Sequence, residues 1–293
     1  MECTASVHHR VGVSEPAADS ARQSRGSNYP PTNHLLRDLQ AESVWISEGE
    51  FHVYAPMTPE VSNERGMTVG VMAAIIDFAG AQVAMRSVGG DWVATADLSY
   101  QPSGGVEHGP LVTSTKLLRA GNRVVVVRTE VFDGRGEETP ARHAGSAVMT
   151  FSRLPREATT TRVAPMSFTI GERFGLSVGP TGFEGAATDA LGLEELAPGS
   201  LLLEKSNYVL NSFGTVNGGA TAMTLVAAAE SMVGAGVAAD ISIRYVGQAG
   251  DGPMRTVARA LAAYDSYTSV DVELLDTSEG DRVVALGTVG IVA

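Results

Sequence analysis

The hydrophobic positions along the chain follow two patterns, and each pattern occurs in both halves. Short runs in which apolar and polar side chains alternate predict β-strands. These runs, separated by turns rich in Gly and Asp, cover residues 43–54, 92–100, 109–118, 123–132 and 144–151, then 201–210, 239–245, 253–263, 268–275 and 282–292. Two longer stretches, 66–85 and 218–233, are almost entirely apolar. They predict buried helices, because a helix that is apolar all round must be covered on every side.

The order of the predicted elements is strand, long helix and then several antiparallel strands, and this order recurs. A predicted short helix over 187–196 opens the second occurrence. We therefore predict two α+β domains, 31–152 and 185–293. Residues 153–184 contain prolines and glycines and are predicted as a linker, and the aperiodic residues 1–30 are predicted as a disordered tail.

The two halves also share sequence identity. Residues 97–133 align without a gap with residues 240–276 at an offset of 143, and eleven of the 37 positions are identical, including Ser99 and Ser242. The period is far longer than the roughly 20–50 residues of solenoid repeats. The chain is therefore predicted to be a duplication of one domain.

The composition narrows the classes of partner. The formal net charge of −12 argues against a nucleic acid, whose phosphates need a basic surface, and against an anionic membrane. The single cysteine, Cys3, and the absence of a leader-like or membrane-spanning apolar run predict a cytoplasmic protein. The histidines show no metal-ligand spacing, so we predict neither a metal nor a cofactor.

A distinctive motif precedes the apolar helix of the second copy. Asn211 is followed six residues later by Asn217, Gly218 and Gly219, and Leu-Gly-Leu-Glu stands upstream at 191–194. This arrangement resembles the PaaI-type hotdog acyl-CoA thioesterases, whose pattern is L-G-I/L-E, a strand and then N-x-x-G-x-x-H-G-G. Asn217 stands where that family usually has His.

The first copy resembles the other half of the same family pattern. Gly70 and Asp77 match G-x-x-x-x-x-x-D on the central helix, and the segment from Arg119 to Arg123 is similar to the R-x-G-R turn. The resemblance implies a double hotdog, in which two antiparallel sheets each wrap a long central helix and pair as a pseudo-dimer. It also implies hydrolysis of an acyl-CoA substrate and assembly into a homo-oligomer.

The central helices align at an offset of 149, which places Gly70 on Gly219. Asp77 then falls on Val226, so the second copy lacks the carboxylate, while the first copy lacks the Gly-Gly entry. The family's sites lie between paired domains. We therefore predict one working site, built from Asp77 and the segment 211–219, and a degenerate opposite site.

Thioester hydrolysis gives each of these residues a role. Asp77 would attack the carbonyl or activate a water, and the sequence leaves both roles open. The N–H groups of Gly218 and Gly219 would stabilise the oxyanion at a helix N-terminus. Asn211 would orient the carbonyl or the water. The structural alternatives are that Asp77 caps a loop, that the glycines form a tight turn and that Asn217 is only an N-cap.

Other charged residues are candidates for less central roles. Lys116, Arg119, Arg123 and Arg128 form a basic cluster that would hold the CoA phosphates, unless it is a solvated strand face. Glu230, on the second apolar helix, is either a secondary site residue or the partner of an arginine.

Two further functions compete with hydrolysis. A hotdog hydratase or dehydratase would carry an Asp–His pair on a loop, and the turn-like contexts of His108 and His143 do not indicate one. A non-catalytic protein that binds acyl-CoA or another acyl ligand would explain the missing family histidine at position 217.

Overall fold

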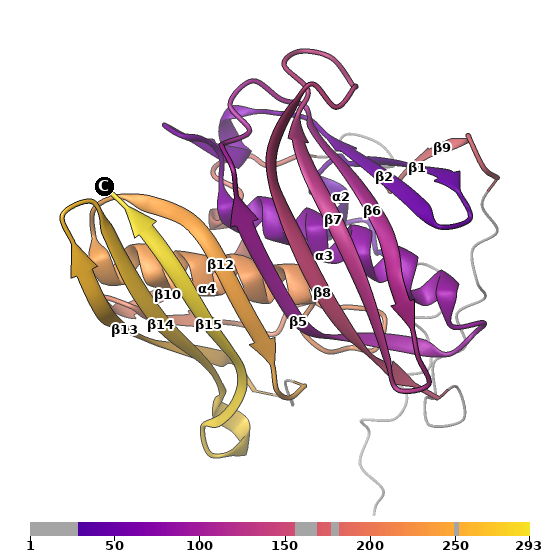
Figure 1. Ribbon diagram of the computed structural model, residues 1–293. Coiled ribbons are helices and arrows are strands. Elements are labelled where there is room, and N and C mark those ends of the chain that lie inside the picture. Colours follow the sequence, from indigo (N-terminus) through magenta and orange to yellow (C-terminus); the bar gives the residue numbers. More distant parts are fainter. Residues whose placement is uncertain (1–28, 156–168, 177–181, 249–251) are drawn as a thin grey trace, which may run out of the picture.

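In a computed structural model of the chain, residues 29–155, 169–176, 182–248 and 252–293 are described. They form one curved antiparallel sheet of 13 strands that packs on two long helices, α3 (Val69–Ser87) and α4 (Gly218–Val233). Figure 1 shows the strands in front and both helices behind them. The chain is therefore α+β, with its helices gathered on one face of the sheet.

Within the described residues, the first half of the chain supplies seven strands in the order β5-β8-β7-β6-β2-β1-β9, and the second half supplies six in the order β10-β11-β13-β14-β15-β12. The first set comprises β1 (Glu42–Ser47), β2 (Glu50–Ala55), β5 (Trp92–Pro102), β6 (Leu111–Ala120), β7 (Val124–Asp133), β8 (Arg142–Leu154) and β9 (Arg173–Gly175). The second comprises β10 (Glu194–Ala197), β11 (Ser200–Leu203), β12 (Val237–Tyr245), β13 (Met254–Tyr264), β14 (Tyr267–Asp276) and β15 (Arg282–Val292). The short elements are α2 (Leu35–Asp38), η1 (Pro59–Val61), β3 (Ser62–Asn63), β4 (Gly66–Met67), η3 (Asp189–Leu191) and η4 (Thr277–Glu279).

Strands β5 and β12 join the two halves. Ser99 is the partner of Ser242 in this antiparallel pair, and their hydroxyl oxygens lie 2.8 Å apart. These serines are equivalent in the repeat, so an approximate two-fold axis passes between them. The prediction of two separate sheets is corrected here, because β5 and β12 hydrogen-bond edge to edge and merge the half-sheets into one.

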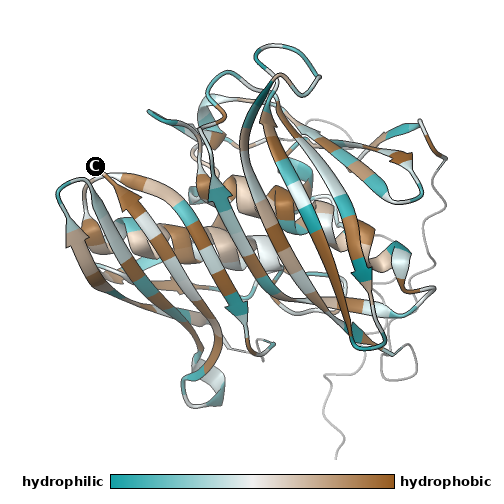
Figure 2. Ribbon diagram, viewed as in Figure 1, coloured by the Kyte–Doolittle hydropathy of each residue, from teal (hydrophilic) through white to brown (hydrophobic). Residues whose placement is uncertain are grey.

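Helix α3 forms the apolar centre of the first half. Thirteen of its 19 residues are buried, and Asp77 is among them. By length and composition α3 could cross a membrane, but 72% of its 18-residue apolar window is buried inside the protein, as in a core helix. Figure 2 shows hydrophobic and hydrophilic positions alternating along the strands, which fits a sheet with one covered face.

The two helices cross at a pair of glycines. A Cβ on Gly70 would lie 3.2 Å from the Met223 Cα, and a Cβ on Gly219 would lie 2.8 Å from the Ala74 Cα. The offset of 149 makes Gly70 equivalent to Gly219 and Ala74 equivalent to Met223. The crossing therefore follows the same approximate two-fold axis, and the glycines let the backbones approach closely.

The segment that precedes each half-sheet packs on the other half. The Leu35 N–H donates to the Tyr208 carbonyl at 3.1 Å, and the Ala187 N–H donates to the Glu60 carbonyl at 2.7 Å. Tyr208 and Glu60 lie on the loops that lead into α4 and α3. Each copy thus braces the entry to the other copy's central helix.

Two predicted elements differ from the structure. Within 187–196 only Asp189–Leu191 is helical, as a short 3-10 turn, and Glu194–Ala197 is already strand β10. The strand predicted over 201–210 ends at Leu203. A polar run follows that residue and ends the alternation on which the prediction relied.

The predicted linker contributes to the sheet. Arg173–Gly175 forms strand β9 and pairs with β1 at the edge of the first half. The rest of the linker lies partly outside the described residues, as do residues 1–28 of the predicted tail. The domain boundaries therefore stay a prediction.

The helix crossing yields a stability prediction. Gly70→Val should lower the free energy of unfolding by about 1–3 kcal/mol, because the new side chain meets the α4 backbone. The control Gly49→Val should change it by no more than about 0.5 kcal/mol, since a Cβ there meets nothing within 4 Å. Chemical denaturation would measure both, and equal effects would contradict the close crossing.

Candidate functional site

A buried carboxylate lies in the middle of α3. Asp77 is only 6% exposed, and it accepts a hydrogen bond from the Thr95 hydroxyl of β5 at 2.7 Å. Burial raises the pKa of Asp77 to about 6, although hydrogen bonds from Thr95 and from the Gly219 N–H lower it. The carboxylate is therefore mostly ionised at neutral pH and takes up a proton in mildly acidic solution.

The first residues of α4 face this carboxylate from the second half of the chain. A Cβ on Gly218 would lie 2.7 Å from Asp77 Oδ2, so a side chain there would collide with the carboxylate. Asn217 caps the helix, and its Oδ1 accepts the Gly219 N–H at 2.8 Å. The structure thus brings four of the predicted site residues together, with the positive end of the α4 dipole against the charge of Asp77.

A buried tyrosine that the sequence did not single out supports this helix end. The Tyr245 hydroxyl, from β12, donates to the Gly218 carbonyl at 2.9 Å. Burial raises the pKa of Tyr245 well above its ordinary value, and the charges of Asp77 and Asp97 raise it further. The phenol therefore stays neutral and holds the glycine backbone in place. The alternation of apolar and polar residues over 239–245 predicts that Tyr245 lies in a strand, but it does not indicate this contact.

A second tyrosine reaches the site from the segment predicted as tail. The Tyr29 hydroxyl hydrogen-bonds with the side chain of Asn217. Burial raises the pKa of Tyr29, the bond to Asn217 lowers it, and the nearby charge of Asp77 raises it. No motif marks this residue, and only the packing of the segment on the second half reveals it.

Asn211 organises the loop that leads to α4. Its Oδ1 accepts the N–H groups of Phe213 and Thr215 at 2.9 and 3.1 Å, and its amide donates to the Thr215 hydroxyl at 2.7 Å. Phe213 in turn makes an edge-on ring contact with Trp92 at 4.7 Å. The side chain is thus bonded within its own loop. Asn211 therefore shapes the loop, and its expected orienting contact with the acyl group stays a prediction.

The position related by the approximate two-fold axis is apolar. Val226 stands in place of Asp77 and Val69 in place of Gly218, and both valines are 4% exposed. The N-cap there is Thr68, which accepts the Val71 N–H at 3.4 Å. Two valines cannot move a proton, so the polar arrangement around Asp77 is not repeated at this position.

Two of the four predicted CoA-binding residues lie away from Asp77. Lys116 and Arg128 are cross-strand partners on the exposed face of β6 and β7, and their sequence neighbours Thr115, Val127 and Thr129 are buried. Glu50 lies 3.3 Å from Lys116, and Glu130 lies 2.6 Å from Arg128. Both side chains point away from the helix face of the sheet, and the role of this pair in CoA binding stays a prediction.

The other two basic residues lie at the end of the β6–β7 hairpin. Arg119 and Arg123 are exposed, and the Arg123 carbonyl accepts the Arg153 N–H at 2.8 Å. Arg153 forms an ion pair with Asp91, which precedes Trp92 at the start of β5. At this end of the sheet Trp92 contacts Phe213, in the loop that leads to α4. Arg119 and Arg123 therefore lie at the end of the sheet nearest that loop and remain candidates for contact with phosphate.

Glu230 closes the connection from α4 to β12. Its Oε1 accepts the Ala238 N–H at 2.9 Å, and burial raises its pKa although that hydrogen bond lowers it. Arg244, which could have been its partner, pairs with Asp97 instead. The structure therefore corrects the expected arginine partner and gives Glu230 a backbone-binding role.

The histidines in turns have structural partners. His108 lies 3.4 Å from Asp133. Burial alone would raise the pKa of Asp133, but hydrogen bonds from four backbone N–H groups hold that pKa below its ordinary value. His143 lies between Ser103 and Glu130, at 2.7 and 2.8 Å, and is exposed. Neither pair lies at the α4 N-terminus. Within the described parts of the chain, no group of three or more His, Cys, Asp or Glu side chains could hold a metal ion.

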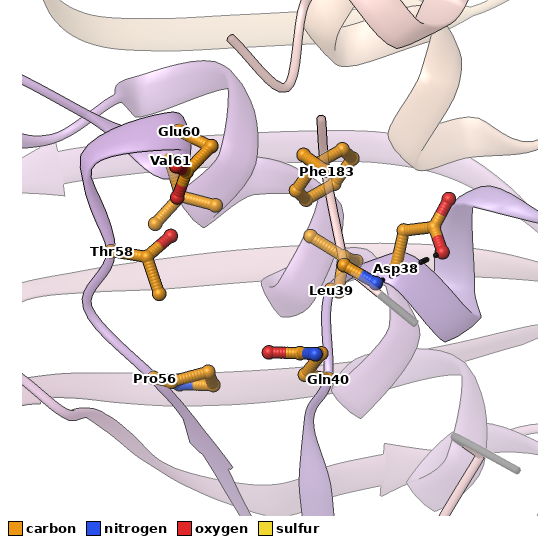
Figure 3. Close-up of a pocket in the computed structure, with 9 residues that line it drawn as sticks. Asp38, Leu39, Gln40, Pro56, Thr58, Glu60, Val61 and Phe183 are labelled. Carbon is orange, nitrogen blue, oxygen red and sulfur yellow. Dashed lines mark hydrogen bonds between the residues drawn. The ribbon is translucent and has the colours of Figure 1, made fainter. Parts of the chain in front are cut away.

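A cavity of about 200 Å³ lies between residues 38–40, 56–61 and 182–183. Figure 3 shows its lining, in which Asp38 and Glu60 supply two carboxylates, and the dashed line marks the Gly182 N–H that donates to Asp38 at 3.4 Å. None of the predicted site residues lines this cavity. Two carboxylates would also repel the phosphates of CoA, so we assign it no part in substrate binding.

Three solved structures are similar to this chain over most of its length. The tesB protein of Mycobacterium avium subsp. paratuberculosis is 12% identical, with a TM-score of 0.56 over 88% of this chain and 97% of that one. An acyl-ACP thioesterase from Bacteroides thetaiotaomicron is 13% identical, with a TM-score of 0.53 over 83% and 98%. A conserved protein with a hot dog fold from Alicyclobacillus acidocaldarius is 14% identical, with a TM-score of 0.52 over 88% and 97%.

These similarities show the fold. The chain has an α+β hotdog fold with two long helices and a large antiparallel sheet, and this part of the prediction is confirmed. No family model and no curated protein matches the sequence. The similar structures include a tesB protein and do not specifically support the PaaI type, so that resemblance stays a prediction.

The raised pKa of Asp77 yields a prediction about stability and pH. Between pH ~4 and ~6 the unfolded chain has lost this proton while the folded protein keeps it, so rising pH lowers the stability contributed by this group. Asp77→Asn removes that dependence. Relative to wild type, the variant should therefore gain about 2 kcal/mol in free energy of unfolding as the pH rises from about 4 to 7.

Urea unfolding of both proteins across this pH range would measure the difference. Glu172→Gln, a change at an exposed carboxylate, is the control and should track wild type at every pH. If the curves for Asp77→Asn and wild type ran parallel, Asp77 would not have a raised pKa.

Proposed function

We propose that the protein is an acyl-CoA thioesterase that hydrolyses its substrate at one composite site between the two hotdog halves. The observation that carries this proposal is the buried Asp77 carboxylate of α3, held by Thr95 and facing the N-terminus of α4. The similar structures named as a tesB protein and an acyl-ACP thioesterase support the same type of reaction.

In the proposed reaction, ionised Asp77 accepts a proton from a water whose oxygen attacks the acyl carbonyl carbon. The carbon–sulfur bond then breaks, and the CoA thiolate leaves and takes up a proton. The products are a free acid and coenzyme A. Direct attack by the carboxylate, followed by hydrolysis of the resulting anhydride, is the other role that the position of Asp77 supports.

The N-terminus of α4 would stabilise the negative charge that develops on the carbonyl oxygen. Glycines at 218 and 219 leave the backbone open to close approach, and the helix dipole favours an anion at this place. Arg119 and Arg123, at the exposed hairpin end, are the residues we propose for contact with the CoA phosphates. Lys116 and Arg128 are left out, because they lie on the opposite face.

The alternative is a protein that binds an acyl-CoA or another acyl ligand without turnover. One observation favours it: the Gly219 N–H, an expected oxyanion donor, is already bonded to Asn217. In that case the acyl ligand would bind, and no thioester would be hydrolysed.

We also propose that the protein is cytoplasmic and assembles into a homo-oligomer. All four residues of the edge strand β10 are exposed, and such an edge can pair with a second chain.

The proposed function predicts the behaviour of two helix carboxylates. On a panel of acyl-CoA esters, Asp77→Asn should lower kcat/KM by at least about 100-fold, because the proton acceptor is lost. Glu230→Gln is the matched control, since it changes a partly buried carboxylate of the other central helix, and it should retain activity. Wild-type activity should fall as the pH drops below about 6, where Asp77 becomes protonated.

The thiol released from each ester would be measured for all three proteins. Equal rates for wild type and Asp77→Asn would disprove the site, and tight acyl-CoA binding without any hydrolysis would favour the alternative. Calorimetric titration of Asp77→Asn with an acyl-CoA should give one ligand per chain. Two ligands per chain would contradict a degenerate second site.

A further inference from the structure

The loop that leads into α4 is bonded to the first residues of the helix. Leu210 and Val216 form an isolated antiparallel bridge that closes this loop. Directly after it, the N–H of Asn217, the N-cap of α4, donates to the Val209 carbonyl at 2.8 Å. A displacement of Val209 or Leu210 is therefore passed on to the N-terminus of α4, which faces Asp77.

A fully buried histidine of the first half contacts the base of this loop. His34 is 0% exposed, and its Nδ1 accepts the Leu36 N–H at 3.1 Å. Burial lowers the pKa of His34, so the ring is neutral at neutral pH. Because Nδ1 accepts, the proton is on Nε2, which donates to the Leu210 carbonyl at 2.8 Å. The imidazole thus links α2 of the first half to the α4 loop of the second.

The tip of the loop makes a second contact with the first half. The ring of Phe213 meets the ring of Trp92 edge-on, with 4.7 Å between the ring centres. Trp92 is the first residue of β5, the strand whose Thr95 hydroxyl holds Asp77. The half that carries the carboxylate therefore also holds the loop that faces it, at the base and at the tip.

The side-chain contact at the base of the loop differs between the two copies. Leu35 and Ala187 occupy corresponding places, because the N–H of each donates to the loop that leads into the other half's helix. The residue before Leu35 is the buried His34, whereas the residue before Ala187 is Ala186, which is exposed and has no side-chain donor. At these corresponding positions, the side-chain hydrogen bond is made on the side where Asp77 faces α4.

We propose that His34 is a positioning residue of the composite site, and that its hydrogen bond to the Leu210 carbonyl fixes the N-terminus of α4 against Asp77. Such positioning affects the rate strongly, because misplacing reacting groups by about 1 Å can cost on the order of 100-fold. His34 acts through the loop and not on the substrate. The inference rests on the proposed thioesterase function and adds to it a residue outside both central helices.

Two substitutions separate the two hydrogen bonds of the ring. His34→Gln can place an amide N–H where Nε2 lies, but it loses the acceptor for the Leu36 N–H. His34→Asn keeps that acceptor, but its side chain is too short to reach the Leu210 carbonyl. Each variant loses one buried hydrogen bond, so both should lower the stability to a similar extent. His143→Asn is the control, because His143 is exposed and lies on β8.

The kinetic test uses the acyl-CoA ester that wild type hydrolyses fastest. His34→Asn should lower kcat about 10-fold with little change in KM, because the helix N-terminus shifts relative to Asp77. His34→Gln and His143→Asn should keep the kcat of wild type. Urea unfolding of the two His34 variants would check that both are folded and similarly destabilised.

A second measurement needs no substrate. The hydrogen bond from the Gly219 N–H lowers the pKa of Asp77, so a retreat of the helix N-terminus should raise that pKa. Titration of the Asp77 carboxyl by carbon-13 NMR should therefore show a higher pKa in His34→Asn than in wild type. In His34→Gln the pKa of Asp77 should stay that of wild type.

The outcomes separate this inference from the proposed function. If wild type hydrolyses the ester and Asp77→Asn does not, but His34→Asn keeps the kcat and the Asp77 pKa of wild type, the inference is overturned and the thioesterase proposal stands. Equal losses of kcat in both His34 variants, or a His34→Asn that does not fold, would show a purely structural role and would also overturn it. If wild type hydrolyses no ester, the proposed function fails, and the Asp77 pKa in the two variants still decides whether His34 positions the helix.

Discussion

The candidate site depends on one carboxylate, Asp77, which is buried on α3 against the N-terminus of α4. Taking an ionised carboxylate out of water is costly unless other groups compensate. Here the Thr95 hydroxyl and the positive end of α4 compensate for part of that cost, and the remainder appears as a pKa near 6. That compensation requires the N-terminus of α4 to lie in contact with Asp77. Glycines at 218 and 219 allow this, because a side chain at either position would collide with α3.

The duplication makes this arrangement possible at low cost. In a symmetric pair, two-fold symmetry would place a second carboxylate against the start of α3, and the core would have to bury two charges. The fused chain keeps Asp77 and has the buried Val226 at the related position, where Gly70 packs against it. The second crossing contact therefore stabilises the core by apolar burial, while the first carries the charged group.

Predictions from the sequence succeeded where one pattern decides the outcome. The apolar run 218–233 is helix α4, because a helix that is apolar all round must be covered on every side. The pairing of Asp77 with the start of α4 was expected from the family resemblance, and in the structure Asp77 lies against Gly218. The sequence offers no prediction for residues whose position is determined by tertiary contacts. Tyr29 lies next to the site only because its segment packs on the opposite half, and nothing local in the sequence indicates this.

The basic cluster divides into two pairs, and strand phase separates Lys116 and Arg128 from Arg119 and Arg123. Leu111, Val112, Thr113 and Thr115 of β6 are fully buried, and alternation begins only toward its far end, where Thr115 is buried and the next residue, Lys116, is exposed. Since side chains alternate between the faces of a strand, Lys116 had to point outward. Local charge density suggested a phosphate site, but strand phase determines which cations can reach the helix face.

The burial of Asp77 both destabilises the folded protein and gives the carboxylate the pKa that its proposed role requires. A carboxylate whose pKa lies near 6 is ionised at neutral pH and still holds a proton more strongly than an exposed one, which is what a general base requires. Additional hydrogen bonds to the Asp77 carboxylate would stabilise the folded protein. They would also lower the pKa of Asp77 and make it a weaker base. The Asn217 side chain accepts the Gly219 N–H and so weakens the hydrogen bond from this N–H to Asp77. The same side chain bonds to the Tyr29 hydroxyl. An asparagine at the position where the resembling family has His therefore affects the strength of the base through the Gly219 N–H.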